Sequence, residues 1–107
     1  MGTQKPRLTT QTLKVLGVFM SRPSGEFSGA EIARITGLAS GTLYPILLRL
    51  ENAKWVESVW ESGDPRELGR PRRRLYGMTG VGKKYARLAI KEFAAAIGIG
   101  RPAWVFS

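Results

Sequence analysis

Hydrophobic residues recur at helical spacing near the start of the chain and predict a first helix over residues 10–21. Its apolar face comprises Leu13, Leu16, Gly17 and Met20, and further apolar residues flank that face at Val15, Val18 and Phe19. A helix that is apolar over more than half of its circumference usually packs against two partners. We therefore expect this helix to contact both the core of its own chain and a second subunit.

Two shorter helices joined by a tight turn are predicted next. Ser28 and Glu31 have the spacing of a capping box, and Gly37 suits the end of the helix that they begin. Ser40 is expected to be the N-cap of the following helix, whose apolar positions are Leu43, Ile46, Leu47 and Leu50. Two helices separated by a short glycine-containing turn indicate a helix-turn-helix.

A β-hairpin and a last helix are predicted in the second half of the chain. Residues 55–60 and 72–78 are rich in strand-forming side chains, and the glycines and prolines of residues 61–71 predict a loop between them. A very short strand is also expected at residues 26–28. Thr79 is expected to cap a helix with one apolar stripe, formed by Val81, Tyr85, Leu88, Ala89, Phe93 and Ala96.

This order of elements is typical of a winged helix-turn-helix. The sequence therefore predicts a mainly α (α+β) fold, a winged helix-turn-helix with a two-stranded wing and a C-terminal dimerisation helix. The expected organisation is a flexible basic arm at residues 1–8, a DNA-binding domain at 9–78, a dimerisation helix at 79–98 and a short apolar tail at 99–107.

The charge of the chain indicates a polyanionic partner. Seventeen Lys and Arg stand against eight Asp and Glu, giving a net charge of +9, and such an excess points to nucleic acid or an acidic membrane surface. The chain has no Cys and no His, so we expect no metal and no cofactor. We expect no enzyme either, because no catalytic spacing relates the acidic residues Glu51, Glu57, Glu61 and Asp64.

The location of the protein is also predicted from absences. No apolar run is long enough to span a bilayer, and the N-terminal residues lack the apolar stretch of a secretory signal. We therefore expect a cytoplasmic, nucleoid-associated protein with no membrane partner.

Two motifs make the prediction more specific. Residues 41–47 (GTLYPIL), followed by Leu50-Glu51, and residues 69–76 (GRPRRRLY), followed by Thr79 and Gly82, resemble the recognition helix and wing of PadR-like transcriptional regulators. The resemblance extends over about residues 10–93 and is to the short members of the family, since one long helix follows the wing. It departs at Ala30, where the family usually has a tyrosine in the pattern Gly-Tyr-Glu-Ile.

The resemblance implies a homodimeric repressor that binds a palindromic operator in double-stranded DNA. The expected DNA contacts are at the start of the recognition helix and in the wing: Ser40, Gly41, Thr42, Tyr44, Arg49, Arg66, Arg70, Arg72, Arg73 and Arg74. Backbone N–H groups at a helix start bind phosphate, and arginines bind phosphate or enter a narrow minor groove. Leu48 is a weaker candidate for contact with a thymine methyl group. Alternatively, Thr42 and Tyr44 serve only in capping and packing, and the wing is a solvated loop.

The terminal helices are expected to form the dimer, as they do in PadR-like relatives. The stripe on the last helix has nothing else large to cover it within so short a chain, and a twofold dimer places two recognition helices about one turn of DNA apart. The expected interface residues are Leu13, Val15, Phe19, Tyr85, Leu88, Ala89, Phe93 and Ala96, with Trp104, Val105 and Phe106 packing on the same surface.

Two other functions remain open on the sequence. Some PadR-like proteins bind flat aromatic compounds at the dimer interface, so a small aromatic effector is one alternative, with Trp104 as a candidate contact. Trp55 and Trp60 are more simply explained as residues of the hairpin and core. The other alternative is a winged-helix module that binds an acidic protein rather than DNA, because such a partner would satisfy the same positive charges.

Overall fold

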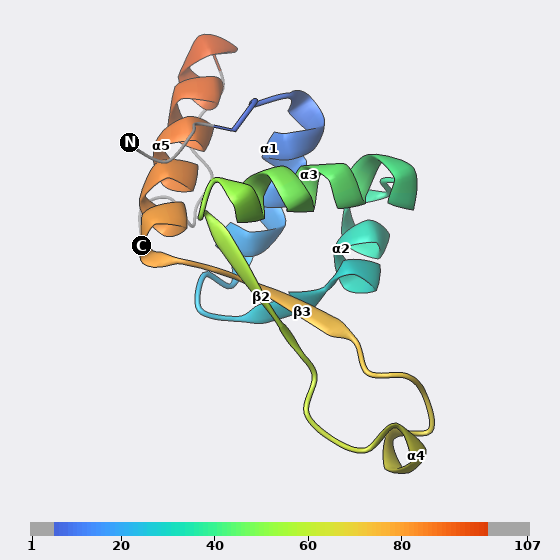
Figure 1. Cartoon of the computed structure of the whole chain (residues 1–107). Coiled ribbons are helices and arrows are strands. Elements are labelled where there is room, and N and C mark those ends of the chain that lie inside the picture. Colours follow the sequence, from blue (N-terminus) through green and yellow to red (C-terminus); the bar gives the residue numbers. More distant parts are fainter. Residues whose placement is uncertain (1–5, 99–107) are drawn as a thin grey trace.

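The computed structural model describes residues 6–98 of the chain (Figure 1). Its elements are α1 (Thr10–Ser21), β1 (Glu26–Ser28), α2 (Gly29–Thr36), α3 (Ser40–Asn52), β2 (Val56–Trp60), α4 (Pro65–Leu68), β3 (Arg74–Met78) and α5 (Gly80–Ala96). The mainly helical winged helix-turn-helix predicted from the sequence is confirmed. The predicted tail at residues 99–107, including Trp104, lies outside the described residues.

The strands form one antiparallel sheet in the order β1-β3-β2. The hairpin predicted between the last two strands is present, with Val56 opposite Met78 and Trp60 opposite Arg74. A third strand joins it because Phe27 of β1 pairs with Tyr76 of β3. The predicted two-stranded wing is therefore confirmed, and the short strand expected at residues 26–28 is present and joins the base of the wing in a three-stranded sheet.

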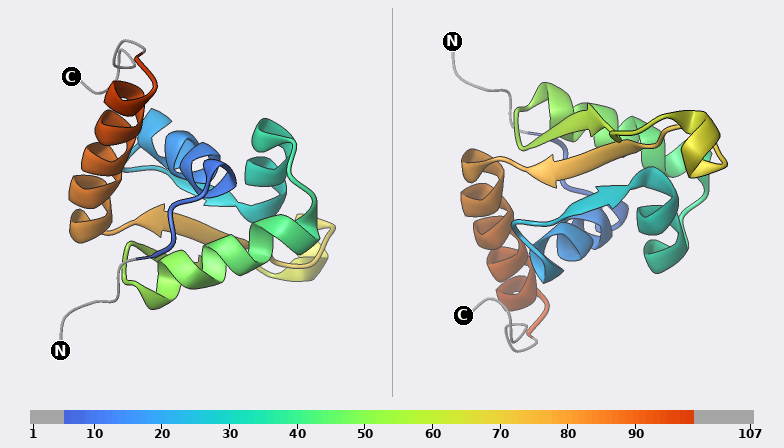
Figure 2. Two further views of the ribbon diagram at one scale, coloured as in Figure 1. Left: turned by 90° about the horizontal axis from the view of Figure 1, so that it is seen from above. Right: turned by 90° about the horizontal axis from the view of Figure 1, so that it is seen from below.

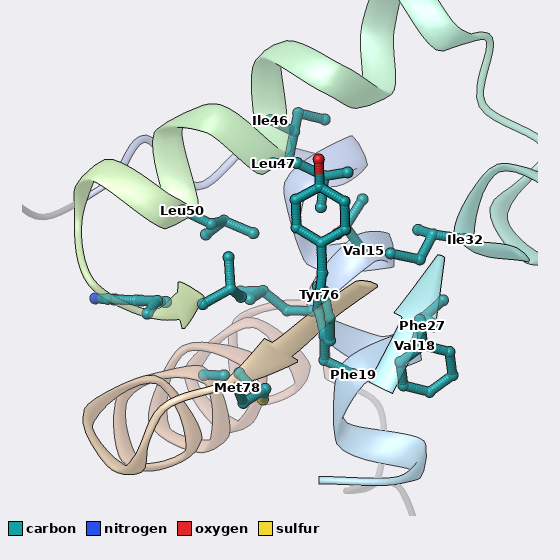
Figure 3. Close-up of a cluster of buried hydrophobic side chains, with 14 of the residues drawn as sticks. Val15, Val18, Phe19, Phe27, Ile32, Ile46, Leu47, Leu50, Tyr76 and Met78 are labelled. Carbon is teal, nitrogen blue, oxygen red and sulfur yellow. The ribbon is translucent and has the colours of Figure 1, made fainter. Parts of the chain in front are cut away.

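The core lies between the helices and one face of this sheet (Figure 3). The rings of Phe19 and Phe27 meet edge to face, with 5.7 Å between their centroids. Tyr76 reaches into the same cluster from the central strand, and burial raises the pKa of its hydroxyl. The predicted inner positions of the recognition helix are all buried, namely Leu43, Ile46, Leu47 and Leu50.

Helix α1 packs against α2, α3 and α5 of its own chain (Figure 2). Its broad apolar surface is therefore covered largely within one protomer. Val15 and Phe19 are fully buried, so neither side chain is available to a second subunit, and their assignment to the dimer interface is corrected. Leu13 is half-buried and packs against the same core.

Local capping signals explain most helix boundaries. The hydroxyl of Ser28 accepts a hydrogen bond from the N–H of Glu31, and the carboxylate of Glu31 accepts one from the N–H of Ser28, as the capping box predicts. Gly37 ends α2 with a φ of 74°, in the left-handed region that favours glycine. Thr79 caps α5 through the N–H of Gly82, as predicted.

Two boundaries differ from the sequence prediction. The N-cap of α3 is Ala39, so Ser40 is the first helical residue rather than the cap. The segment predicted as a loop contains the single turn α4, which Asp64 caps by accepting from the N–H of Arg66 and which Gly69 ends in the left-handed conformation. The last residues of the predicted mobile arm are also packed, since Leu8 lies against the core.

Candidate nucleic-acid interface

One side of α3 is fully occupied by the core, and the other side is open. Four apolar residues turn inward, and this leaves the predicted contact residues of the helix exposed: Ser40, Gly41, Thr42, Tyr44 and Arg49. Leu48 is exposed on the same helix. The structure therefore places all five predicted residues of α3 where a ligand can reach them.

The start of α3 differs from the other helix starts in the described part of the chain. Side chains of Thr9, Ser28, Asp64 and Thr79 cap the other four helices, whereas Ala39 provides no side-chain cap to α3. The first N–H groups of a helix have no partner within the helix. At α3 these groups are flanked by the small residues Ser40 and Gly41, and a Cβ at residue 41 would meet open space. The arrangement suits close approach of a phosphate.

Tyr44 has a packing role in addition to its exposure. Its ring and hydroxyl lie so close to Gly29, the first residue of α2, that any side chain at residue 29 would collide with them. The residue is nevertheless 46% exposed, so part of its side chain is accessible to a ligand while its hydroxyl end is held against α2. The alternatives of packing and contact thus both apply to this residue. Ala30, which replaces the usual tyrosine of the family pattern, is exposed.

The five arginines of the wing fall into two groups. Arg66, Arg72 and Arg73 are exposed and form no ion pair within residues 6–98, whereas Arg70 and Arg74 each pair with a glutamate. Sequence reasoning missed this division because neither glutamate is adjacent in sequence to its arginine.

Arg70 is held by Glu61 from the opposite side of the wing. Its two terminal nitrogens donate to the two carboxylate oxygens over 2.6 and 3.0 Å. These bonds lower the pKa of Glu61 to about 2, since they stabilise the ionised carboxylate. Glu61 also accepts from the backbone N–H of Arg73 over 3.3 Å.

Arg74 belongs to a network that reaches the recognition helix. Its Nε donates to the hydroxyl of Ser58 over 2.8 Å, and Ser58 donates to the carboxylate of Glu51 on α3 over 2.6 Å. The guanidinium also lies 5.6 Å from the ring centroid of Trp60. Trp60 is 61% exposed, so it belongs to the hairpin but not to the core, whereas Trp55 is buried.

The tertiary structure brings the wing and the recognition helix to one side of the molecule. The tip of the wing, which contains α4, extends beyond the sheet (Figure 1), and in both views of Figure 2 it lies at the end of the molecule where α3 begins. Arg66 belongs to α4 at the tip, and Arg72 and Arg73 belong to the segment that leads from the tip into β3. The wing that carries them and the open start of α3 are far apart in sequence but lie at one end of the molecule.

The outer face of α5 carries exposed apolar side chains. Tyr85, Leu88 and Phe93 are 45%, 44% and 37% exposed, and Ala96 is also exposed. Ala89 is buried within the protomer, which removes most of its side chain from the predicted dimer surface. Tyr85 also stacks on Trp55, with 5.9 Å between the ring centroids.

Neither metal chemistry nor a membrane span is indicated by the described residues. Across residues 6–98, no group of three or more acidic side chains could hold a metal ion. Within the same range, no helix is both long and apolar enough to cross a membrane.

The sequence matches the transcriptional regulator PadR-like family over residues 29–88, from the first residue of α2 into α5. The chain belongs to this family. The PadR-like assignment confirms the resemblance inferred from the recognition-helix and wing motifs, and it confirms the prediction of a transcriptional regulator rather than an enzyme.

Solved structures share the fold of this PadR-like protein at low sequence identity. A PadR family transcription regulator from Clostridium difficile R20291 is 22% identical with a TM-score of 0.68, covering 84% of this chain and 92% of that one. The DNA complex of MepR from Staphylococcus aureus is 20% identical with a TM-score of 0.65, covering 84% and 68%. NadR in complex with 4-hydroxyphenylacetate is 22% identical with a TM-score of 0.67, covering 85% and 59%. No curated protein matches the chain.

Proposed function

We propose that this PadR-like regulator binds double-stranded DNA in a sequence-dependent manner and represses transcription as a homodimer on a palindromic operator. The start of α3 enters the major groove, where Thr42 and Tyr44 meet base edges, and the wing follows the phosphate backbone. The observation that carries the proposal is that the open start of α3 and the wing with its exposed arginines lie at one end of the molecule.

The electrostatics of the two elements supports this assignment. Arg66, Arg72 and Arg73 are exposed and carry positive charge that no glutamate of the described residues neutralises. The charges of Arg70 and Arg74 are each paired with a glutamate. The start of a helix adds the positive end of its dipole and free N–H donors. Phosphate contacts fix the position of a protein on DNA, and base contacts then provide specificity. The MepR–DNA complex shows that a protein of this fold binds DNA, which supports the same partner here.

The homodimer is supported by the exposed apolar stripe of α5. Tyr85, Leu88 and Phe93 share this face, and large apolar side chains clustered on one helix are costly to leave in water. Pairing of this face with a second copy also provides the two recognition helices that a palindromic operator requires.

The decisive experiment is fluorescence-anisotropy titration of duplex DNA from upstream of the gene, compared with a scrambled duplex across a salt series. A dimer that makes about 6–10 phosphate contacts should lose about 10³–10⁵ in affinity between about 50 and 200 mM salt. We expect tighter binding to the upstream duplex that persists at the higher salt. Equal affinity for both duplexes would contradict sequence-dependent binding there, and binding to neither would favour an acidic protein partner.

A second proposal is a small aromatic effector that binds near the α5 surface. Tyr85 is exposed and stacked on the buried Trp55, so it presents an aromatic face beside apolar neighbours. The NadR complex with 4-hydroxyphenylacetate shows that a regulator of this fold accommodates such a ligand. Titration with planar aromatic compounds, followed by tryptophan fluorescence, tests the proposal. An unchanged spectrum across the set would contradict it.

A further inference from the structure

The wing contains more arginines than it presents to solvent as free cations. Five arginines lie between residues 66 and 74, but two of them already bind carboxylates of the same chain. A carboxylate occupies the same position on a guanidinium that a phosphate would take, because both anions accept two parallel hydrogen bonds. Each paired arginine therefore has fewer N–H donors free for a phosphate than an unpaired arginine has.

Glu61 connects the two sides of the wing below its tip. Its backbone N–H donates to the carbonyl of Arg73 over 2.8 Å, and its carboxylate accepts from the N–H of the same residue. The carboxylate also accepts hydrogen bonds from both terminal nitrogens of Arg70. Arg70 donates a further hydrogen bond to the carbonyl of Pro71 over 3.2 Å. Glu61 thus fixes the end of β2, residue 70 and the start of β3 in one arrangement.

Glu51 makes the corresponding connection between the wing and the recognition helix. Its carboxylate accepts from Ser58 of β2 and lies 3.4 Å from a terminal nitrogen of Arg74 on β3. Arg74 completes the network by donating to Ser58. The three side chains come from three elements, so they limit how far the hairpin can turn relative to α3.

The energetic contribution of these pairs to folding is small. Side-chain exposure is 33% and 22% for Arg70 and Glu61, and 45% and 30% for Arg74 and Glu51. Ion pairs that remain accessible to water contribute little to stability, since solvent screens them. The two ion pairs therefore act mainly on the orientation of the wing and on the number of arginines that remain free to bind phosphate.

We propose that Glu61 and Glu51 are positioning residues that retain Arg70 and Arg74 as internal cations, so that the phosphate contacts of the wing are made by Arg66, Arg72 and Arg73. The inference rests on the proposed DNA-binding function and deepens it. It divides the arginine-rich wing into residues that set its orientation and residues that bind the backbone of DNA.

Single alanine variants of the five arginines test this division. Binding to a random-sequence duplex of about 30 base pairs is measured across a salt series, because the slope of log K against log salt falls by about 0.9 for each phosphate that the protein no longer binds. For R66A, R72A and R73A we expect the slope to fall by about 0.9, or by twice that amount when both protomers bind the duplex. We expect unchanged slopes for R70A and R74A. A slope for R70A reduced as much as that for R72A would overturn the proposal.

Substitution of Glu61 should steepen the salt dependence of DNA binding, whereas substitutions of the three free arginines should flatten it. In E61Q the amide oxygen still accepts from the N–H of Arg73, but the ionic attraction to Arg70 is removed, so Arg70 becomes free to bind phosphate. We expect the salt slope to steepen by about 0.9 per protomer bound. The gain should disappear in the double variant E61Q/R70A.

Glu67→Gln provides the matched control. Glu67 is exposed on α4, forms no ion pair within residues 6–98, and gives the same change in net charge when substituted. If E61Q and E67Q steepen the slope equally, the effect is one of net charge and the proposal is wrong. Thermal unfolding of each variant establishes that it is folded.

The same series separates this inference from the function on which it rests. If the unaltered protein binds neither the random duplex nor the upstream duplex, both the proposed function and this inference fail. If it binds with a steep salt dependence but all five alanine variants reduce the slope equally, DNA binding stands and only the division of the arginines is overturned.

Discussion

The side chain of Tyr44, on the recognition helix, lies directly against Gly29 at the first position of the preceding helix. The contact leaves no space for a Cβ at residue 29, yet the outer part of the tyrosine remains half-exposed. Gly29 therefore sets the orientation of a residue proposed to contact DNA.

Substitution of Gly29 by alanine tests this relationship. Because the ring of Tyr44 is partly exposed, we expect it to rotate outward, with a change of about 1 kcal/mol or less in the free energy of unfolding. DNA affinity should fall about as far as it does in Tyr44→Ala. Chemical denaturation and anisotropy titration measure the two effects. Gly41→Ala adds a methyl group in open space and is the control for stability. Wild-type DNA affinity in G29A would show that the orientation of Tyr44 is unimportant.

Gly82 is a glycine whose replacement should lower the stability of the fold. A Cβ there would collide with the backbone carbonyl of Trp55, which cannot rotate away as a side chain can. We expect Gly82→Ala to lower the free energy of unfolding by about 1–3 kcal/mol. Gly80→Ala, at the first position of the same helix, meets open space and should change stability by less than about 0.5 kcal/mol. Equal unfolding midpoints for the two variants would contradict the close approach.

The Glu61–Arg70 pair predicts a pH dependence of stability. The pKa of Glu61 is lowered in the folded protein from 4.5 to about 2, so the folded state favours the ionised carboxylate. The stabilisation of the folded protein that results is fully present above the pKa of Glu61 in the unfolded chain, and it is lost as the pH falls from about 4.5 through 2. Because solvent screens this exposed pair, denaturation of the wild type and of E61Q across this range should give a small stability difference that shrinks with acidification. A difference independent of pH would contradict the pairing.

The proposed dimer surface on α5 can be tested with a single charge. Leu88→Glu places a carboxylate in the exposed apolar stripe, where burial against a second copy would carry a large desolvation cost. We expect this variant to be a monomer by light scattering at micromolar concentration, and we expect the unaltered protein to be a dimer under the same conditions. Arg87→Glu introduces the same side chain at an exposed position on the polar side of the helix and should remain dimeric. Dissociation of both variants alike would indicate a general effect of charge.

Much of the fold was predictable because its signals are local. The capping box of Ser28 and Glu31, the left-handed Gly37 and the cap at Thr79 depend on residues only a few positions apart. Helical periodicity likewise identified the buried residues of α3, and α1 begins and ends where the sequence predicted. These features follow from backbone hydrogen bonding and side-chain periodicity, which a single segment of chain contains in full.

The tertiary structure decided what depends on distant partners. The apolar sides of α1 predicted a second subunit, but Val15 and Phe19 are buried because neighbouring helices of the same chain cover them. The sequence contained the arginines of the wing and the acidic residues, but not the pairing of Arg70 with Glu61. Sequence by itself therefore determined the elements, the charge and the family resemblance. Which cations stay free and which apolar faces stay exposed was decided by packing, since both depend on contacts between segments that are far apart along the chain.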